Sequence, residues 1–187
     1  MASDSEASKV QLHQLFFQPY LSETTILKRV DEMGQMLKER MGGRQPVFLV
    51  MLKGAFLFAA DLIRASQLKS EIDFVRTASY SGTETTRNIR LLLPPDPELV
   101  KGRDIILVED IVDSGYTMQA FLPKLEALSP NSITLVTLLH KPAAQQVKVK
   151  IDLIGFSIPN QFVVGYGLDY NGLGRELRGI YRLAEEY

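Results

Sequence analysis

The spacing of hydrophobic residues changes several times along the chain and predicts strands and helices in alternation. Hydrophobic residues recur at helical spacing over residues 26–41, with Ser22 before them as a candidate N-cap and Gly42-Gly43 after them as a stop signal. The uninterrupted apolar run Val47–Leu52 is typical of a strand buried on both faces. Residues 72–78 alternate between apolar and polar, which is typical of a half-buried strand.

The same alternation continues to the end of the chain. Pro123 lies inside one predicted helix, where it removes a hydrogen bond, so we expect a kink or a late helix start there. Further strands are expected over residues 105–108, 133–139, 151–156 and 162–165, and further helices over residues 55–66 and up to about residue 128. There are no internal repeats and no linker, so we expect one α/β domain over residues 1–187, with a mostly parallel, twisted sheet flanked by helices.

Three segments depart from this regular pattern. Residues 1–19 are expected to form a mobile N-terminal tail, and residues from about 151 to 187 a small hood subdomain. The stretch from Ser79 to Asn88 is rich in Ser, Gly and Thr and predicts a loop, after which residues 88–93 return as a strand of the same hairpin. Loops of this length often act as lids, although a plain hairpin tip is the alternative.

The most informative polar residues follow the apolar strand 105–108. Glu109, Asp110 and Asp113 come at its end, and ligands of parallel sheets bind where such a strand turns into the next helix. Carboxylates at this place suit the hydroxyl groups of a sugar or a hydrated magnesium ion. The alternative is an ordinary turn with solvated acids.

The loop after these acids is suited to a phosphate group. Ser114 and Thr117 offer hydroxyl donors, and Gly115 allows backbone N–H groups to approach an anion at the start of a helix. The chain has no Walker motif, and Gly165 and Gly167 lack the third glycine of a dinucleotide fingerprint. Because the loop has no lysine, it favours a terminal monophosphate.

Composition and charge exclude other kinds of site. The chain has no cysteine and only two histidines, His13 and His140, which excludes disulfides, thiolate catalysis and zinc sites rich in these residues. A metal ion must then be held by oxygen ligands, which favours Mg²⁺. A net charge of −1 gives no basic surface for nucleic acid or for an anionic membrane. The polar, acidic N-terminal residues are typical of neither a signal peptide nor a transit peptide, so we expect a cytoplasmic protein.

Residues 108–117 resemble the motif that binds phosphoribosyl pyrophosphate (PRPP) in type I phosphoribosyltransferases. Further resemblances follow in the family's order, at Leu52-Lys53-Gly54, at Ser79-Tyr80, at Lys141, and at residues 162–171 with Arg175. The resemblance extends from about Tyr20 to the C-terminus and is strongest to the purine branch. It implies the type I phosphoribosyltransferase fold and Mg²⁺-dependent transfer of the phosphoribosyl group from PRPP to N9 of hypoxanthine or guanine. The products would be IMP or GMP and pyrophosphate.

The resemblance also implies a role for each matched residue. PRPP would be bound by Glu109, Asp110, Asp113, Ser114, Gly115, Tyr116 and Thr117, and pyrophosphate by Leu52, Lys53, Gly54 and Arg175. Ser79 and Tyr80 would open a lid, and Lys141, Phe162, Val163 and Asp169 would bind the purine. Glu109, Asp110 and Asp169 would place the magnesium, and Asp113 would be the catalytic base near N7 of the purine.

The purine contacts explain a preference for 6-oxopurines. Lys141 would donate to O6 of the base, an interaction that adenine, with a 6-amino donor, does not offer. The ring of Phe162 would stack on the base, an interaction worth about 1–3 kcal/mol, and the Val163 backbone would bind the base edge. In the family, the peptide bond here joining Leu52 and Lys53 is often cis. Without the resemblance, Lys53 would be taken for a surface lysine and Phe162 for a core residue.

Two alternatives remain open at this point. The base is xanthine in the first, and in the second the chain is a regulatory relative that binds PRPP or a nucleotide without catalysis. Tyr116 departs from the family pattern, because smaller or basic residues are more usual at this loop position, and residues 94–98 are a local insertion. By resemblance alone we expect a homodimer or homotetramer.

Overall fold

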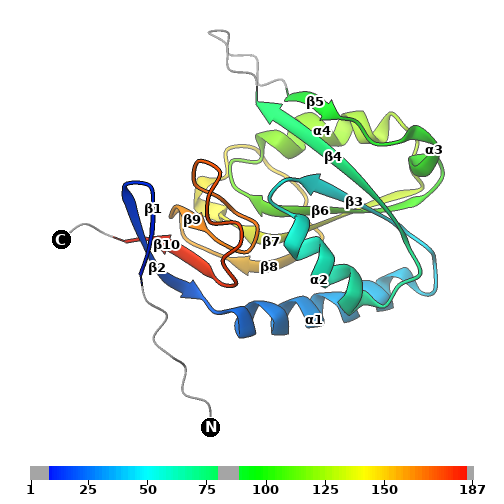
Figure 1. Cartoon of the computed structure of the whole chain (residues 1–187). Helices are drawn as coiled ribbons and strands as arrows, with labels where there is room; N and C mark the ends of the chain where they lie inside the picture. Colours follow the sequence, from blue (N-terminus) through cyan, green and yellow to red (C-terminus); the bar gives the residue numbers. More distant parts are fainter. Residues whose placement is uncertain (1–8, 80–88, 185–187) are drawn as a thin grey trace.

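The computed structural model describes residues 9–79 and 89–184, which form a large sheet, a small sheet and helices around them (Figure 1). The large sheet has six strands in the order β5-β4-β3-β6-β7-β8, and all neighbours are parallel except β5 and β4. These strands are β3 (Val47–Leu52), β4 (Glu71–Ser79), β5 (Ile89–Leu93), β6 (Asp104–Val112), β7 (Ser132–His140) and β8 (Leu153–Ser157). The predicted α/β fold with a mostly parallel sheet is confirmed.

Helices cover both faces of the large sheet and bury it. On one face, α1 (Glu23–Met41) and α2 (Phe56–Ser66) pack against Phe48 and Val50 of β3. On the other face, α4 (Tyr116–Glu126) packs against Leu49 and Met51 of the same strand. This two-sided burial is the physical reason for the uninterrupted apolar run in β3. Short helices α3 (Pro97–Val100) and η1 (Pro142–Ala144) lie in the connections.

The ends of α1 confirm its predicted signals, whereas α4 departs from one. The hydroxyl of Ser22 accepts a hydrogen bond from the Thr25 N–H at 3.2 Å, and Gly42 ends α1 in the left-handed conformation with φ of 54°. The late start considered for the helix around Pro123 is wrong. Helix α4 begins at Tyr116 and continues through Pro123. Among the helices of the described residues, none is both long and apolar enough to cross a membrane.

The small sheet, which we call the hood, joins residues from both ends of the chain. Its strands are β1 (Val10–Leu12), β2 (Leu15–Leu21), β10 (Ile180–Leu183) and β9 (Val163–Val164), in this order. The prediction of a mobile tail is therefore wrong for residues 10–19, because Phe17 in β2 is fully buried against Val164. The predicted start of the hood near residue 151 is also wrong, since β8 is an edge strand of the large sheet. Residues 1–8 lie outside the described part of the chain.

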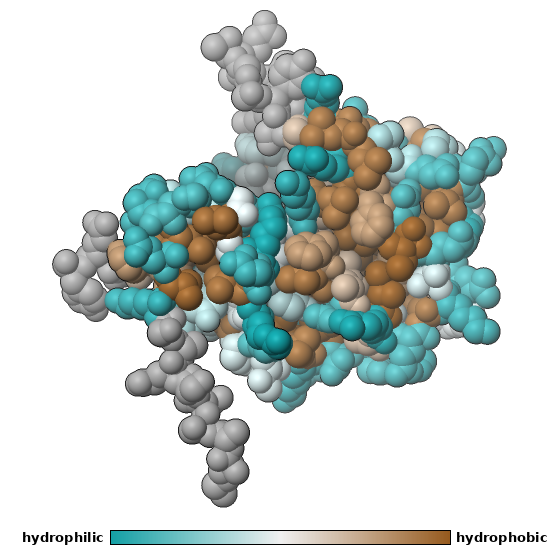
Figure 2. Space-filling view, in the orientation of Figure 1, coloured by the Kyte–Doolittle hydropathy of each residue, from teal (hydrophilic) through white to brown (hydrophobic). Residues whose placement is uncertain are grey.

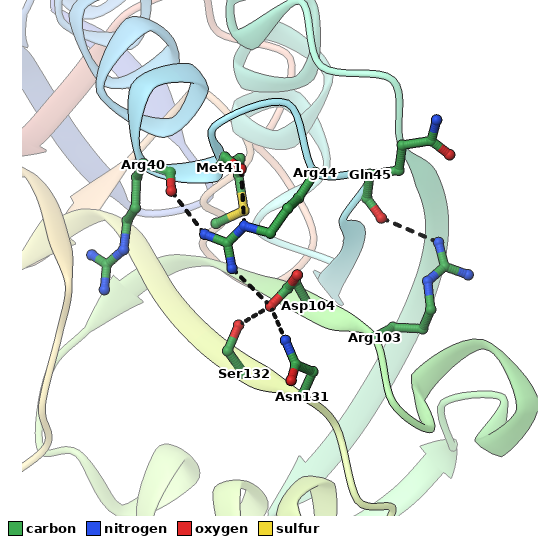
Figure 3. Close-up of polar contacts among 8 residues, drawn as sticks. All are labelled: Arg40, Met41, Arg44, Gln45, Arg103, Asp104, Asn131 and Ser132. Atoms are coloured by element: carbon green, nitrogen blue, oxygen red, sulfur yellow. Dashed lines mark hydrogen bonds and ion pairs between the residues drawn. The ribbon is translucent and has the colours of Figure 1, made fainter.

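Asp104, the first residue of the central strand β6, joins several segments at the amino ends of the parallel strands (Figure 3). Its Oδ1 atom accepts hydrogen bonds from the Ser132 hydroxyl at 2.5 Å, the Asn131 amide at 2.8 Å and the Arg44 guanidinium at 3.1 Å. Arg44 also donates to the carbonyl oxygens of Arg40 and Met41, which lie in the last turn of α1 and lack partners within the helix. The hydrogen bond from Ser132, assisted by Asn131 and Arg44, lowers the pKa of Asp104 below its ordinary value.

Replacing Asp104 with Ala is expected to lower the free energy of unfolding by about 2 kcal/mol at neutral pH, because three donors lose a charged acceptor. An acid whose pKa is lower in the folded state stabilises the fold above its unfolded pKa, and this contribution disappears as the pH falls through the folded pKa. The difference between wild type and Asp104→Ala in urea unfolding should therefore shrink below about pH 4. Asp104→Asn keeps one acceptor and should lose less. A difference that does not change with pH would contradict this assignment.

Candidate active site

A cavity of about 240 Å³ lies at the carboxyl end of β6, where the sequence predicted a ligand site. The parallel strand β6 brings its last residues to the N-terminus of α4, so acids and loop amides line the same space. The lining residues are Glu109, Ile111, Val112, Asp113, Ser114, Gly115, Thr117 and Met118. Five of the residues predicted to bind PRPP therefore share one cavity, whereas Asp110 and Tyr116 lie beside it.

The two carboxylates at the end of β6 are partly withdrawn from water. Burial of its side chain, together with the negative charge of Asp110, raises the pKa of Glu109 well above its ordinary value. Burial also raises the pKa of Asp110, although hydrogen bonds and the Arg175 guanidinium act in the opposite direction. The Oε2 atom of Glu109 is buried and has no hydrogen-bond partner among the described residues. The pair thus offers an unsatisfied acceptor to a cation or to hydroxyl donors.

The Lys53-Gly54 segment lies directly against these acids. A Cβ atom on Gly54 would be 1.5 Å from Oδ2 of Asp110, so a larger residue at this position would displace the carboxylate. The peptide bond between Leu52 and Lys53 is cis, as the resemblance implied. The side chain of Lys53 is exposed at the end of the buried strand β3. The structure therefore brings the predicted pyrophosphate segment and the predicted ribose acids together.

The phosphate loop is shaped by its own glycine and supported from behind. Gly115 has a φ of 86° at the start of α4, and a Cβ atom there would be 2.7 Å from the carbonyl oxygen of Val147. The carbonyl oxygen of Ser114 accepts hydrogen bonds from the N–H groups of Gln146 and Val147 at 3.0 and 3.2 Å. This support fixes the loop at the N-terminus of α4, the end of a helix that favours an anion. Thr117, in the first turn of α4, is exposed.

Asp113 and Lys141 form an ion pair beside the loop. The Lys141 ammonium lies 3.2 Å from Oδ2 of Asp113, and the Lys141 N–H donates to the carbonyl oxygen of Val112. The Lys141 side chain is only 8% exposed, whereas the Asp113 side chain is 46% exposed. The predicted catalytic base and the predicted contact to the purine O6 atom therefore meet, and the acid is the member that faces solvent.

Asp169 and Arg175 are also joined, but not to the acids of β6. Arg175 lies 2.6 Å from Oδ1 of Asp169, and Oδ2 of Asp169 accepts the Gly172 N–H at 2.7 Å. Within residues 9–79 and 89–184, no three acidic or histidine side chains gather in a group able to hold a metal ion. The structure therefore does not bring Asp169 into one cluster with Glu109 and Asp110.

Phe162 lies on the hood, apart from the phosphate cavity. Its ring is 43% exposed and makes an edge contact with Tyr170 at a centroid distance of 5.7 Å. It lines a second cavity of about 780 Å³ together with Phe16 and Gln161. Val163, next to it, is buried in β9 and pairs with Arg182 of β10. Since Phe162 is exposed, the simple core assignment for it is wrong.

The predicted lid begins where β4 ends. Ser79 is the last residue of β4, and β5 returns from Ile89 as the antiparallel partner that the sequence indicated. Tyr80 lies outside the described residues, and so does the loop that follows it. The two strands that the loop connects are therefore paired as the sequence predicted.

The structure adds Tyr166 and Asp61 to the residues that the sequence singled out. The turn Gly165-Tyr166-Gly167 has positive φ at every residue, and the Tyr166 hydroxyl donates to Oδ2 of Asp61 at 2.5 Å. Burial, followed by this hydrogen bond, raises the pKa of Tyr166 above its ordinary value. A Cβ atom on Gly167 would be 2.0 Å from the carbonyl oxygen of Gly54. The two spaced glycines were the signal for this turn, but nothing local indicated Asp61.

Gly167→Ala is expected to lower the free energy of unfolding by about 2–4 kcal/mol, because the new methyl group meets the Gly54 backbone and the φ of 100° is strained. Gly172→Ala is the matched control. Gly172 has a φ of 91° but nothing within 4 Å of an added Cβ, so only the backbone strain of about 1 kcal/mol remains. Denaturant unfolding of both variants measures the difference. Equal losses would contradict the close contact between the hood and the Lys53-Gly54 segment.

Comparisons with known proteins agree with this geometry. Residues 20–171 match the family model described as the phosphoribosyl transferase domain. The hypoxanthine phosphoribosyltransferase of Escherichia coli K12 is 42% identical over 153 residues, covering 80% of this chain and 85% of that protein. The hypoxanthine-guanine phosphoribosyltransferase of Lactococcus lactis is 41% identical over 158 residues, covering 84% and 85%. A crystal structure of a hypoxanthine phosphoribosyltransferase from Staphylococcus aureus superimposes with a TM-score of 0.84 at 33% identity, covering 89% and 91%.

Proposed function

Because the chain belongs to the phosphoribosyltransferase family, we propose that it is a purine salvage enzyme acting on hypoxanthine or guanine. The phosphoribosyl group of PRPP is transferred to N9 of the base, so the bond from the anomeric carbon to pyrophosphate breaks and the bond to N9 forms. The products are IMP or GMP and pyrophosphate. The whole chain is proposed to act as one phosphoribosyltransferase domain, and its relatives of that name support this proposal.

One observation supports this proposal most strongly, namely the Asp113–Lys141 pair at the edge of the phosphate loop. A regulatory protein that only binds PRPP needs the loop but not an acid–ammonium pair beside it. A purine bound next to the ribose would meet Lys141 with its O6 atom and Asp113 with its N7 edge. Lys141 then selects a carbonyl oxygen, and Asp113 receives the proton that leaves N7 as N9 bonds to the sugar.

Other site residues are proposed to bind the terminal phosphate and the ribose of PRPP. Residues 114–117 and the N-terminus of α4 bind the terminal phosphate, because the dipole of a helix favours an anion at its N-terminus. Glu109 and Asp110 bind the ribose hydroxyls through their carboxylate oxygens, of which Oε2 of Glu109 has no partner among the described residues. The transition state resembles an oxocarbenium ion, as in glycosyl transfer generally.

The leaving pyrophosphate is proposed to lie against the Lys53-Gly54 segment. Backbone N–H groups of this segment and the ammonium of Lys53 are donors, and Arg175 adds a guanidinium suited to bidentate phosphate binding. Arg175 already influences Asp110 electrostatically, so it is close to the acids of β6. The lid that begins at Ser79 and Tyr80 is proposed to close over this group and exclude water.

Glu109 and Asp110 also fit a magnesium ion. Two adjacent carboxylates, one with a buried oxygen that has no partner among the described residues, are the donors that a hard cation prefers. When bound, Mg²⁺ would neutralise charge on the pyrophosphate as it leaves. Asp169, engaged by Arg175 and Gly172, is proposed to reach the metal or the purine only after giving up one of these contacts.

Binding of PRPP with Mg²⁺ is expected to release protons. Desolvation raises the pKa of Glu109 and Asp110 in the free protein, and a cation or ribose hydroxyls stabilise the ionised form, so binding lowers these pKa values. Affinity should therefore increase with pH above about 4, the ordinary value for Glu, until Glu109 is ionised in the free protein. Calorimetry in buffers of different ionisation enthalpy measures the protons released. In Glu109→Gln the release should fall; an unchanged release would contradict the assignment.

The regulatory alternative differs from the enzyme in one measurable respect. We propose mixing the full chain with PRPP, Mg²⁺ and hypoxanthine and following pyrophosphate and IMP together. The enzyme releases pyrophosphate only when the base is present and forms an equal amount of IMP. PRPP binding without release of pyrophosphate on adding any 6-oxopurine would instead support the regulatory alternative.

A homodimer or homotetramer in the cytoplasm is part of the same proposal. Figure 2 shows hydrophobic residues gathered over the face that α2 and β4 cross in Figure 1. Phe56 of α2 and Ile72 and Phe74 of β4 are among the exposed large hydrophobic side chains. Apolar surface of this kind is typical of protein–protein contacts and supports an oligomer.

A further inference from the structure

The hood and the body of the protein are joined by a partly buried hydrogen bond between two residues that have no role in the proposed binding of substrates. The Tyr166 hydroxyl donates to Oδ2 of Asp61 at 2.5 Å, across 105 residues of sequence. Tyr166 is 5% exposed, and the other oxygen of Asp61 accepts a hydrogen bond from Arg64 within α2. Both oxygens of this carboxylate are therefore used, and the Tyr166 ring is held in one place.

The turn that carries Tyr166 also sets the position of the pyrophosphate segment. Gly167 packs on the carbonyl oxygen of Gly54, and Gly54 packs on the carboxylate of Asp110, each without room for a methyl group. Because these three layers are in contact, a shift of the turn moves the Lys53-Gly54 segment relative to the acids of β6. Helix α2, which holds Asp61, begins only two residues after Gly54.

The same turn holds the purine side of the site. The Gly167 N–H donates to the carbonyl oxygen of Arg175 at 3.0 Å, and Arg175 Nη1 donates back to the carbonyl oxygen of Gly167 at 2.5 Å. The Nη2 atom of Arg175 binds Asp169. The turn is thus in contact with the residues proposed for pyrophosphate and for the base.

We propose that Tyr166 and Asp61 are a positioning pair that holds the Gly165-Tyr166-Gly167 turn against the Lys53-Gly54 segment, so that the pyrophosphate and purine subsites keep their spacing. This inference rests on the proposed function. The backbone contact between Gly167 and Gly54 sets the distance between the hood turn and the body, and the Tyr166–Asp61 hydrogen bond prevents the turn from moving away. Tyr166 has a φ of 49°, a left-handed conformation that is uncommon for a residue other than glycine and that persists where its surroundings hold it.

The test compares variants that remove the hydrogen bond with one that keeps it. Tyr166→Phe and Asp61→Ala remove it, and each is expected to raise KM for PRPP and lower kcat, so that kcat/KM falls about tenfold or more. Asp61→Asn keeps an acceptor for the Tyr166 hydroxyl and should retain most of the activity. The double variant Tyr166→Phe/Asp61→Ala should be no worse than Asp61→Ala alone, because both changes remove one interaction.

The matched control is Glu23→Ala. Glu23 in α1 accepts a hydrogen bond from Arg178 at 2.9 Å and so also joins the body to the hood, but neither residue of this ion pair belongs to α2. It should leave kcat/KM unchanged. Rates are expressed per folded protein, measured by thermal unfolding of each variant. If Tyr166→Phe does not fold, the comparison of Asp61→Ala with Asp61→Asn decides in the same way.

Two outcomes would overturn the positioning role. They are wild-type kinetics for the folded fraction of Tyr166→Phe or Asp61→Ala, and an equal loss in Glu23→Ala. If the wild type turns over PRPP and the variants have the same kcat/KM as the wild type, only this inference is contradicted. If the wild type shows no turnover of PRPP with any purine base, the proposed function itself is contradicted.

Discussion

Asp113→Asn is expected to lower kcat with hypoxanthine by about 10²- to 10³-fold, a typical contribution of a positioned general base. The dissociation constant for PRPP should remain nearly unchanged. An amide has nearly the same shape as the carboxylate, and its oxygen still accepts a hydrogen bond from Lys141, which lies 3.2 Å away in the wild type. What the variant loses is the ability to accept the proton that leaves N7. Steady-state kinetics with PRPP binding measured in parallel provide the test.

Asp152→Asn is the control for this change. Asp152 forms an ion pair with Arg40 at 2.7 Å, as Asp113 does with Lys141, but it is more buried than Asp113 and lies outside the candidate site. The same loss of charge there should lower stability and leave kcat per folded protein unchanged. If Asp113→Asn weakened PRPP binding as much as it lowered kcat, Asp113 would bind substrate and would not act as the base.

Lys141→Ala is expected to remove most of the discrimination between bases. Hydrogen-bonding sites reject analogues that cannot make the bond by large factors, so kcat/KM for hypoxanthine should fall about 10²- to 10³-fold. The value for adenine should not fall, because adenine presents a donor to the ammonium and gains nothing from Lys141. The ratio of the two values is the measured quantity.

The structure allows a clean comparison for this variant. Lys141 is buried, but its partner Asp113 is half-exposed, so water can solvate the carboxylate that the variant leaves behind. Lys124→Ala, on the exposed face of α4, removes a lysine with no proposed role and should change neither value. A Lys141→Ala variant that kept the wild-type ratio would show that another residue selects the base.

Local sequence was sufficient where function depends on one strand and the turn after it. Strand β6, the loop at Ser114 and Gly115, and the start of α4 are continuous in sequence, so their shared cavity followed from the pattern. The cis bond at Lys53 came from the family resemblance and not from the residues themselves. The confirmed parallel sheet likewise followed from short apolar runs separated by helices.

Contacts between distant segments could not be predicted in the same way. Residues 10–19 were assigned to a tail because the apolar residues of so short a segment give no sign of the distant strand that they pack against. Phe17 is nevertheless buried, since β2 pairs with β10 near the other end of the chain. The Tyr166–Asp61 hydrogen bond has the same character, because each residue alone resembles an ordinary surface residue.

For Asp169, the magnesium-binding role implied by the resemblance differs from the contacts that the structure shows. Its nearest partners are Arg175 and the Gly172 N–H, and among the described residues it does not form a metal-holding group with Glu109 and Asp110. The sequence could not predict this, because it does not show that the turn after Asp169 folds back on it. Its contribution to magnesium therefore stays a proposal, separate from that of the two acids of β6.

The most direct test of the central claim is turnover of the full chain with PRPP, Mg²⁺ and each of hypoxanthine, guanine, xanthine and adenine in turn. Nucleotide and pyrophosphate should be measured together for every base. The proposed function predicts equal amounts of the two products with hypoxanthine or guanine and none with adenine. Turnover of xanthine would set its rank among the 6-oxopurines. No turnover with any base, or a preference for adenine, would contradict the assignment.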